Sequence, residues 1–168
     1  KKPNQEICEL EVVNSPRAVA EALVLKTAWA ILSSEAHEDM YIDINSTGDK
    51  ESFAKFEREL TVYFKKNMHL IGASDRQRFK TNIWSIIQAT ETHLESFVAN
   101  APKSLNTLSE VSRDHFKEVL EFLESFEIPY RIAHNLLPPK GSSSHTQFEI
   151  RKTVLTKKGE TSELLACG

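Results

Sequence analysis

The chain has 168 residues, of which 40% are hydrophobic and 27% are charged. That length suits one ordinary domain, or one domain that carries a helical insertion. A net charge of −3 excludes wholesale electrostatic binding of DNA, and no apolar run approaches the roughly 18 residues of a membrane span. We therefore expect a soluble globular protein that has neither DNA nor a membrane among its partners.

Residues 1–48 have the pattern of a strand, a helix and a second strand. Apolar and acidic residues alternate over residues 7–13, which predicts a strand with one solvated face. Ser15 and Pro16 favour the start of a helix, and residues 18–32 are apolar nearly all round. We expect this helix to be buried against a sheet, and we expect residues 40–44 to form the next strand.

Residues 49–127 change to helical periodicity, so we interpret them as a separate helical insertion. A capping-box pattern at residues 74–77 predicts the start of a helix through Phe79 and Ile83, and residues 107–110 predict another start. An apolar stripe at helical spacing consists of Phe53, Phe56, Leu60, Tyr63 and Phe64.

Strand character returns in residues 128–168. Residues 130–137, 146–156 and 161–167 predict strands, and residues 157–160 predict a hairpin turn between the last two. The order predicts an α+β domain whose mostly antiparallel sheet is formed by the first and last parts of the chain and is interrupted by the helical insertion.

The common catalytic and metal-binding motifs are missing from the sequence. There is no Gly-x-Ser-x-Gly turn for a nucleophilic serine, and residues 140–142 lack the glycine-rich turn of a phosphate loop. Cys8 and Cys167 lie at opposite ends of the chain and are expected to be reduced. No secretory leader pattern begins at Lys1, so we expect a cytoplasmic protein. We expect no metal site, because no i, i+4 pair occurs among His37, His69, His93, His115, His134 and His145.

Basic and acidic residues are distributed unevenly along the helical insertion. Residues 65–80 hold five basic side chains against the single acid Asp75, whereas residues 109–127 hold six acids against two basic residues. The basic group is either a solvated helix surface or a surface that meets nucleic-acid phosphates. The candidates for phosphate contact are Lys65, Lys66, Arg76, Arg78 and Lys80.

Short motifs at consistent spacing cover nearly the whole chain. They are Asn14-Ser15-Pro16 with Ala20-Glu21; Asn45-Ser46-Thr47-Gly48-Asp49; Arg76 and Arg78 with the segment from Asn82 to Ile87; Ala101-Pro102 with Leu108, Ser112, His115-Phe116 and Val119; Ile128-Pro129-Tyr130-Arg131; and Phe148-Glu149. This set resembles the bacterial-type histidyl-tRNA synthetases. The resemblance implies a class II synthetase-like antiparallel sheet that binds histidine and ATP, and a helical insertion that helps to hold the tRNA acceptor stem.

The sequence departs from this family in the histidine pocket. Family members carry Arg-Gly-Leu-Asp-Tyr-Tyr before the Phe-Glu strand, where the Arg stabilises charge in histidine activation and the Tyr residues shape the pocket. Here residues 138–143 are Pro-Pro-Lys-Gly-Ser-Ser. The resemblance also puts Glu6 where a pocket Gln is expected and Leu10 where a pocket Glu is expected. The degenerate pocket positions are therefore Glu6, Leu10, Pro138, Gly141, Ser142 and Ser143.

The family's motif 1, the catalytic Arg of motif 2 and motif 3 are expected to lie outside this sequence. The resemblance therefore implies no ATP site and no cofactor in this chain, and ATP with Mg²⁺ only in a longer, active parent protein. tRNA is a possible partner, and a homodimer or another protein partner stays open.

Three functions are compatible with the sequence. The first is a synthetase-like domain that has lost histidine activation and binds tRNA or a partner through its insertion. The second is the central portion of a divergent but active histidine–tRNA ligase. The third is a protein-interaction module.

Overall fold

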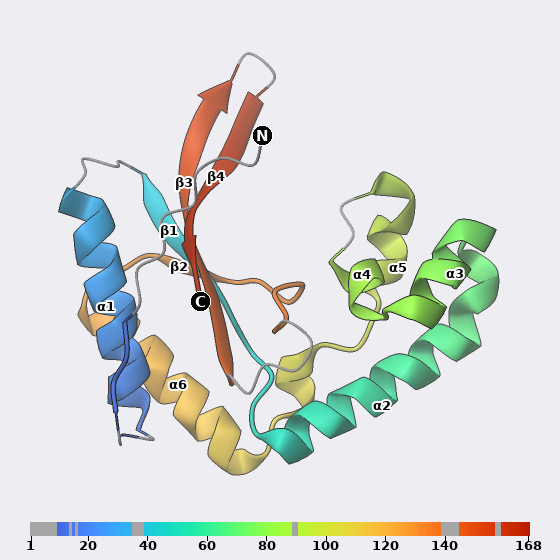
Figure 1. Ribbon diagram of the computed structural model, residues 1–168, viewed down its shortest axis with the longest axis horizontal. Coiled ribbons are helices and arrows are strands. Elements are labelled where there is room, and N and C mark those ends of the chain that lie inside the picture. Colours follow the sequence, from blue (N-terminus) through green and yellow to red (C-terminus); the bar gives the residue numbers. More distant parts are fainter. Residues whose placement is uncertain are drawn as a thin grey trace.

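The computed structural model describes residues 10–13, 15, 17–34, 39–88, 91–138, 145–156 and 159–168. It contains a four-stranded sheet, helices packed on that sheet, and a helical arm that extends away from it (Figure 1). The elements in chain order, with η for a 3₁₀ helix, are α1 (Ala18–Ser34), β1 (Met40–Ser46), α2 (Lys50–Asn67), η1 (Met68–Leu70), α3 (Ala73–Thr81), α4 (Trp84–Ile87), η2 (Thr92–Leu94), α5 (Glu95–Ala99), η3 (Ser104–Thr107), α6 (Glu110–Ser125), β2 (Tyr130–Ile132), β3 (Thr146–Thr156) and β4 (Gly159–Cys167).

The sheet has the strand order β2-β1-β3-β4. β3 runs antiparallel to β1, with Ile150 opposite Ile42, and β4 runs antiparallel to β3. β2 runs parallel to β1, with Tyr130 opposite Ile42. The predicted antiparallel sheet is therefore confirmed for β1, β3 and β4, whereas β2 makes the sheet mixed. The parallel pairing needs a long crossover, which the chain between β1 and β2 provides.

The predicted strands agree with the structure best at the C-terminal hairpin. β3 has the predicted bounds, β4 includes residues 161–167, and Thr156 lies opposite Gly159 across the turn. The predicted strand at 130–137 ends at Ile132, because the chain then turns toward the arm, where Leu137 is buried. In the predicted strand at 7–13, the described residues 10–13 form no strand.

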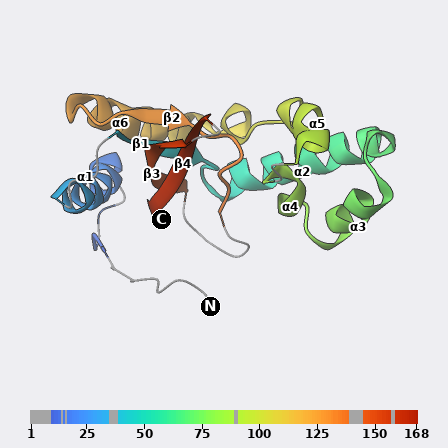
Figure 2. The ribbon, with the colours of Figure 1, turned by 90° about the horizontal axis from the view of Figure 1, so that it is seen from above.

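α1 and α6 cover one face of the sheet (Figure 2). Alternate residues of β1 point to opposite faces, and Ile42 and Ile44 are fully buried in the core that these helices form with the sheet. α6 contributes Phe116 and Leu123 to the same core. α6 lies within residues 49–127, which were predicted as a separate insertion, and its apolar stripe packs on the sheet. The helical arm therefore consists of α2 to α5 with η1 and η2.

α1 is buried along one side only. Ala18, Ala22 and Leu25 are at most 1% exposed, whereas Val19 and Leu23 are 43% and 52% exposed. The helix is therefore buried against the sheet, as expected, along the side that carries Ala18, Ala22 and Leu25. Among the described residues, no helix combines the length and the apolar character needed to cross a bilayer.

The helical arm has its own apolar core. The Trp84 ring stacks on those of Phe53 and Phe56, at centroid distances of 5.6 and 5.9 Å. Phe64 of α2 stacks on Phe79 of α3 at 4.9 Å. The predicted stripe is thus confirmed as the side of α2 that packs against the rest of the arm.

Two predicted helix starts are displaced in the structure. α3 begins after Gly72 and has no capping side chain, so the capping-box prediction at residues 74–77 was wrong. Asp75, a member of that pattern, instead faces Arg78 and His93. α6 is capped by Ser109 rather than by Thr107, because the Ser109 hydroxyl accepts the backbone N–H of Ser112.

Candidate functional site

The sheet face opposite α1 and α6 carries charged side chains from three strands. Asp43 of β1 lies opposite Arg131 of β2 and opposite Glu149 of β3. Tyr41 lies two residues before Asp43 on the same face, opposite Arg151 of β3. We call these five residues the sheet-face cluster.

The members of the sheet-face cluster form hydrogen bonds and ion pairs with one another. The Arg131 guanidinium donates to both carboxylate oxygens of Asp43, at 2.8 and 3.0 Å, and lies 4.0 Å from the centroid of the Tyr41 ring. The hydrogen bonds to Asp43 raise the pKa of Arg131 above its ordinary value. Arg151 donates to Glu149 at 2.6 and 2.8 Å and lies 3.4 Å from Asp43. The positive charges of the two arginines are therefore balanced by the negative charges of Asp43 and Glu149.

A cavity of about 540 Å³ opens beside the sheet-face cluster and is also lined by Gln88 of the arm and by Asn135. The Asp43 side chain is only 12% exposed, and the Arg151 side chain 26%. Ion pairs that are partly removed from water are costly to break one partner at a time. A charged ligand would therefore have to displace existing ion pairs before it could bind the sheet face.

Of the predicted pocket residues that the structure describes, neither Leu10 nor Pro138 lines this cavity. Leu10 lies on the helix-covered side of the sheet, where it lines a separate cavity with Val24 and Leu32 of α1 and with Phe148. The position of Leu10 therefore gives no support to the loss of a pocket residue there. Pro138 is buried. The other predicted pocket residues, Glu6, Gly141, Ser142 and Ser143, lie outside the described residues.

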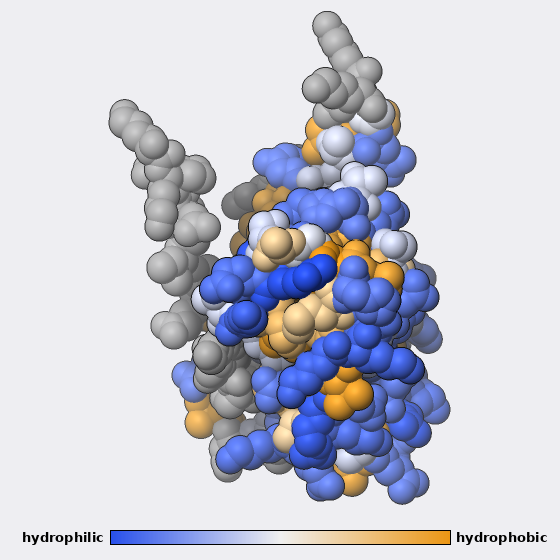
Figure 3. All heavy atoms as spheres, turned by 90° about the vertical axis from the view of Figure 1, so that its right-hand side faces the viewer, coloured by the Kyte–Doolittle hydropathy of each residue, from blue (hydrophilic) through white to orange (hydrophobic). Residues whose placement is uncertain are grey.

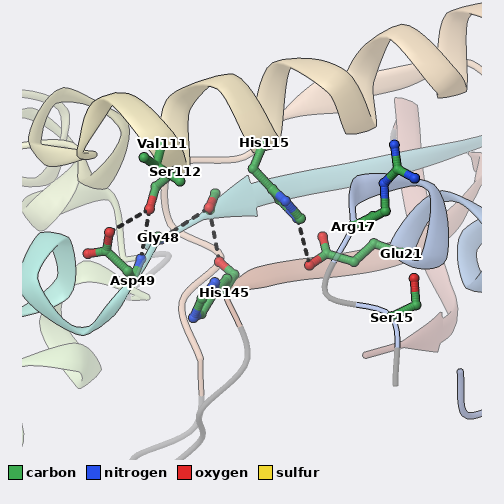
Figure 4. A pocket seen from close by; sticks show the side chains of 10 residues that line it. Ser15, Arg17, Glu21, Gly48, Asp49, Val111, Ser112, His115 and His145 are labelled. Atoms are coloured by element: carbon green, nitrogen blue, oxygen red, sulfur yellow. Dashed lines mark hydrogen bonds and ion pairs between the residues drawn. The ribbon is translucent and has the colours of Figure 1, made fainter. Parts of the chain in front are cut away.

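A second cavity, of about 430 Å³, lies between α1, α6 and the end of β1 (Figure 4). His115 of α6 reaches across it to Glu21 of α1, with 3.1 Å between Nε2 and Oε1. The other carboxylate oxygen of Glu21 is buried and has no hydrogen-bond partner among the described residues. This pair could not be predicted from the sequence, because 94 positions separate its members.

Asp49, at the far end of the second cavity, joins the N-termini of two helices. As the N-cap of α2, it accepts the backbone N–H of Ser52 at 2.8 Å. Its second oxygen accepts the hydroxyls of Ser109 and Ser112, at 2.6 and 3.0 Å, where α6 begins. These hydrogen bonds, chiefly the one from Ser109, hold the pKa of Asp49 well below its ordinary value. One carboxylate thus stabilises the positive ends of α2 and α6.

The rest of the Asn45-to-Asp49 motif also has a structural role. Asn45 donates to the carbonyl of Leu136 at 2.8 Å, which fixes the chain after β2. Gly48 has φ of +67°, and a Cβ atom at this position would lie 2.6 Å from a methyl carbon of Leu108. The motif therefore forms the joint between the sheet and the arm.

The five predicted phosphate contacts lie on α2 and α3 of the arm, whose outer end is seen in Figure 3 as a mostly hydrophilic surface. Four of them are exposed and form no ion pair with any described residue. These four, which we call the arm cations, are Lys65, Lys66, Arg76 and Lys80. Arg78 differs, because it bonds Asp75 and Glu91 within the arm.

Metal binding finds no support in the part of the chain that the structure describes. No group of three or more His, Cys, Asp or Glu side chains there is arranged to hold an ion. His93 and His115 each contact one carboxylate, that of Asp75 and that of Glu21.

No protein-family model matches the chain. Sequence relatives do: the histidine–tRNA ligase of Pelodictyon phaeoclathratiforme is 30% identical over 147 residues, which are 88% of this chain and 34% of the relative. The ligase of Aromatoleum aromaticum is 33% identical over 122 residues, or 73% of this chain and 28% of the relative. The chain is homologous to the histidine–tRNA ligases. It spans about a third of the length of the relatives that it matches.

The fold agrees with this ligase homology. The apo structure of Staphylococcus aureus histidyl-tRNA synthetase matches with a TM-score of 0.63 and 22% identity, over 88% of this chain and 35% of that chain. The chain therefore has part of a class II synthetase fold, as the resemblance implied. The sheet-face cluster was not predicted from the sequence, although polar residues at positions 41 and 43 of the predicted strand at 40–44, which is otherwise apolar, were a signal for it.

Proposed function

We propose that this chain is a histidine–tRNA ligase-like domain that does not activate histidine and that binds tRNA through its helical arm. The ligase homology supports the class of domain. The single observation that carries the loss of activation is the sheet-face cluster, in which Arg131, Asp43, Arg151 and Glu149 neutralise one another.

The loss of activation follows from the polar groups that a histidine site needs. A site that recognises an imidazole and an α-carboxylate must present polar groups that are free before the ligand arrives. On this sheet face the carboxylates and guanidinium groups already bind one another. The family's pocket Arg is replaced by Pro138, which has no side-chain donor.

tRNA binding is supported by the arm cations. Lys65, Lys66, Arg76 and Lys80 are exposed at one end of the arm and are not neutralised by described neighbours. Each cation that meets a phosphate releases a counterion, so even four of them contribute strongly at low salt. The acidic α6 packs on the sheet, away from that end (Figure 1).

The loss of activation is tested with the protein that contains this chain. Histidine-dependent exchange of pyrophosphate into ATP should be at background level, while a related active ligase assayed in parallel gives full exchange. Robust exchange would refute the proposal. It would favour the second candidate, a divergent active ligase, which the homology to ligases supports directly.

tRNA binding is tested by charge reversal on the arm. The double variant Lys65→Glu and Lys66→Glu should bind tRNA more weakly, and the slope of log affinity against log salt should fall by about 2. Lys117→Glu on α6, whose side chain is 73% exposed, is the matched control and should keep the parental slope. An unchanged affinity and slope in the double variant would refute the tRNA role and favour a protein-interaction module.

A further inference from the structure

Arg78 holds three parts of the arm together. One terminal nitrogen of its guanidinium donates to Asp75 at 3.2 Å and to Glu91 at 2.8 Å. The other terminal nitrogen donates to the backbone carbonyl of Ser85 at 3.0 Å. Its partners lie in the first turn of α3, in α4 and just before η2, so the side chain links segments that follow one another along the arm.

Asp75 extends the same set of contacts. Its side chain is only 5% exposed, and its second carboxylate oxygen lies 3.0 Å from Nε2 of His93. The contacts with His93 and Arg78 hold the pKa of Asp75 below its ordinary value, with the hydrogen bond from His93 as the largest cause. We call Asp75, Arg78, Glu91 and His93, with the Ser85 carbonyl, the α3 clamp.

The arm cations on α3 lie on the helix that this clamp contacts, and Nε of Arg76 also donates to the carbonyl of Ile71 at 3.0 Å. Arg76 and Lys80 are four residues apart, so they lie on one face of α3. α3 has only nine residues, too few for an isolated helix to be stable in water, so its contacts must hold it. The clamp and the Phe64–Phe79 stack provide those contacts.

We infer that Arg78 is a positioning residue: it fixes α3 so that Arg76 and Lys80 face the tRNA backbone together with Lys65 and Lys66, and it does not itself bind phosphate. This inference rests on the tRNA-binding function proposed above. It separates Arg78 from the other four basic residues of the sequence pattern, because only Arg78 has its guanidinium bound by two carboxylates and a carbonyl.

Removal of a clamp carboxylate gives the decisive test, because the two possible roles of Arg78 predict opposite signs. Glu91→Gln removes a negative charge near a proposed RNA surface, so electrostatics alone would leave tRNA affinity unchanged or raise it. Loosening of the clamp should instead weaken binding, by about two- to fivefold for an exposed ion pair. Glu95→Gln is the matched control, because Glu95 is nearby and exposed and forms no ion pair with a described residue. It should bind at least as tightly as the parent.

The salt dependence of binding separates positioning from contact. Arg78→Gln should lower the affinity and keep the parental slope of log affinity against log salt, whereas Arg76→Gln should lower that slope by about 1. The inference is overturned if Glu91→Gln binds as tightly as Glu95→Gln, or if Arg78→Gln lowers the slope as Arg76→Gln does.

Hydrogen exchange keeps the test independent of tRNA. Arg78→Gln and Glu91→Gln should each speed amide exchange in residues 82–88, and Glu95→Gln should not. If the parent protein fails to bind tRNA, the proposed function fails and this measurement still decides whether the clamp exists. Unchanged exchange in both clamp variants would overturn the inference, whether or not tRNA binds.

Discussion

Replacement of Asp49 should destabilise the joint between the sheet and the arm. Asp49→Ala removes the acceptor for the Ser52 backbone N–H and for the hydroxyls of Ser109 and Ser112. Loss of an N-cap costs about 1 kcal/mol, and a hydrogen bond to a charged group contributes about 1.5–3 kcal/mol. The Ser109 and Ser112 hydroxyls lie 3.0 Å apart and can bond each other, which offsets part of the loss.

We therefore expect Asp49→Ala to lower the free energy of unfolding by about 2–4 kcal/mol at neutral pH. For a protein of this size that corresponds to a fall of about 5–15 °C in the melting temperature. Asp49→Asn keeps a capping oxygen and should lose less. Asp114→Asn, at an exposed position on α6, is the control and should change the melting temperature little.

The pH dependence of the effect follows from the lowered pKa of Asp49. Because its folded pKa lies below the unfolded value of about 3.9, the charged carboxylate stabilises the fold fully above that value and progressively less below it. Urea unfolding of the parent and of Asp49→Asn should therefore show a difference that is constant near pH 7 and shrinks below about pH 4. A difference that stays constant down to pH 3, or an Asp49→Ala variant as stable as Asp114→Asn, would refute the reasoning.

Three further substitutions test other parts of the structure. Gly48→Ala should lower the urea midpoint strongly, because it combines φ of +67° with a 2.6 Å approach to Leu108; a midpoint equal to the parent's would contradict the joint geometry. Trp84→Ala should lower the free energy of unfolding by about 3–5 kcal/mol in chemical denaturation, since the ring is 6% exposed and stacks on two phenylalanines. Arg131→Gln should destabilise more than the double change Asp43→Asn with Arg131→Gln, because the single change leaves the carboxylate of Asp43, which is only 12% exposed, without its main cation; equal melting temperatures would argue against the sheet-face pairing.

Local pattern predicted much of the fold. Helix α1 follows from its apolar run, and β3 and β4 follow from two β-rich segments with a glycine between them. These elements are determined by residues close in sequence. The core side of α2 also follows from its stripe, because Phe56, Leu60 and Phe64 repeat every four residues.

The candidate site was less predictable, because its contacts join distant residues. The Asp43–Arg131 pair spans 88 positions and the Asp49–Ser109 bond spans 60. Periodicity could assign α6 to a helix but not to the sheet side of the molecule, since an apolar stripe does not say which surface it meets. The ion pair between Arg78 and Glu91 could not be predicted for the same reason, because Glu91 lies 13 positions away in a different segment.

The geometry of the joint also bears on how the arm can be exchanged. The chain leaves the sheet at Asp49 and returns at Ser109, and the side chains of these two residues are 2.6 Å apart. A segment whose ends meet can be removed or replaced with little strain on the part that remains. Residues 50–108 thus leave and rejoin the rest of the chain at one point. A short linker across the joint would still remove Leu105 from the sheet core and expose Leu137, so α1, α6 and the sheet should pack with lower stability than they have now.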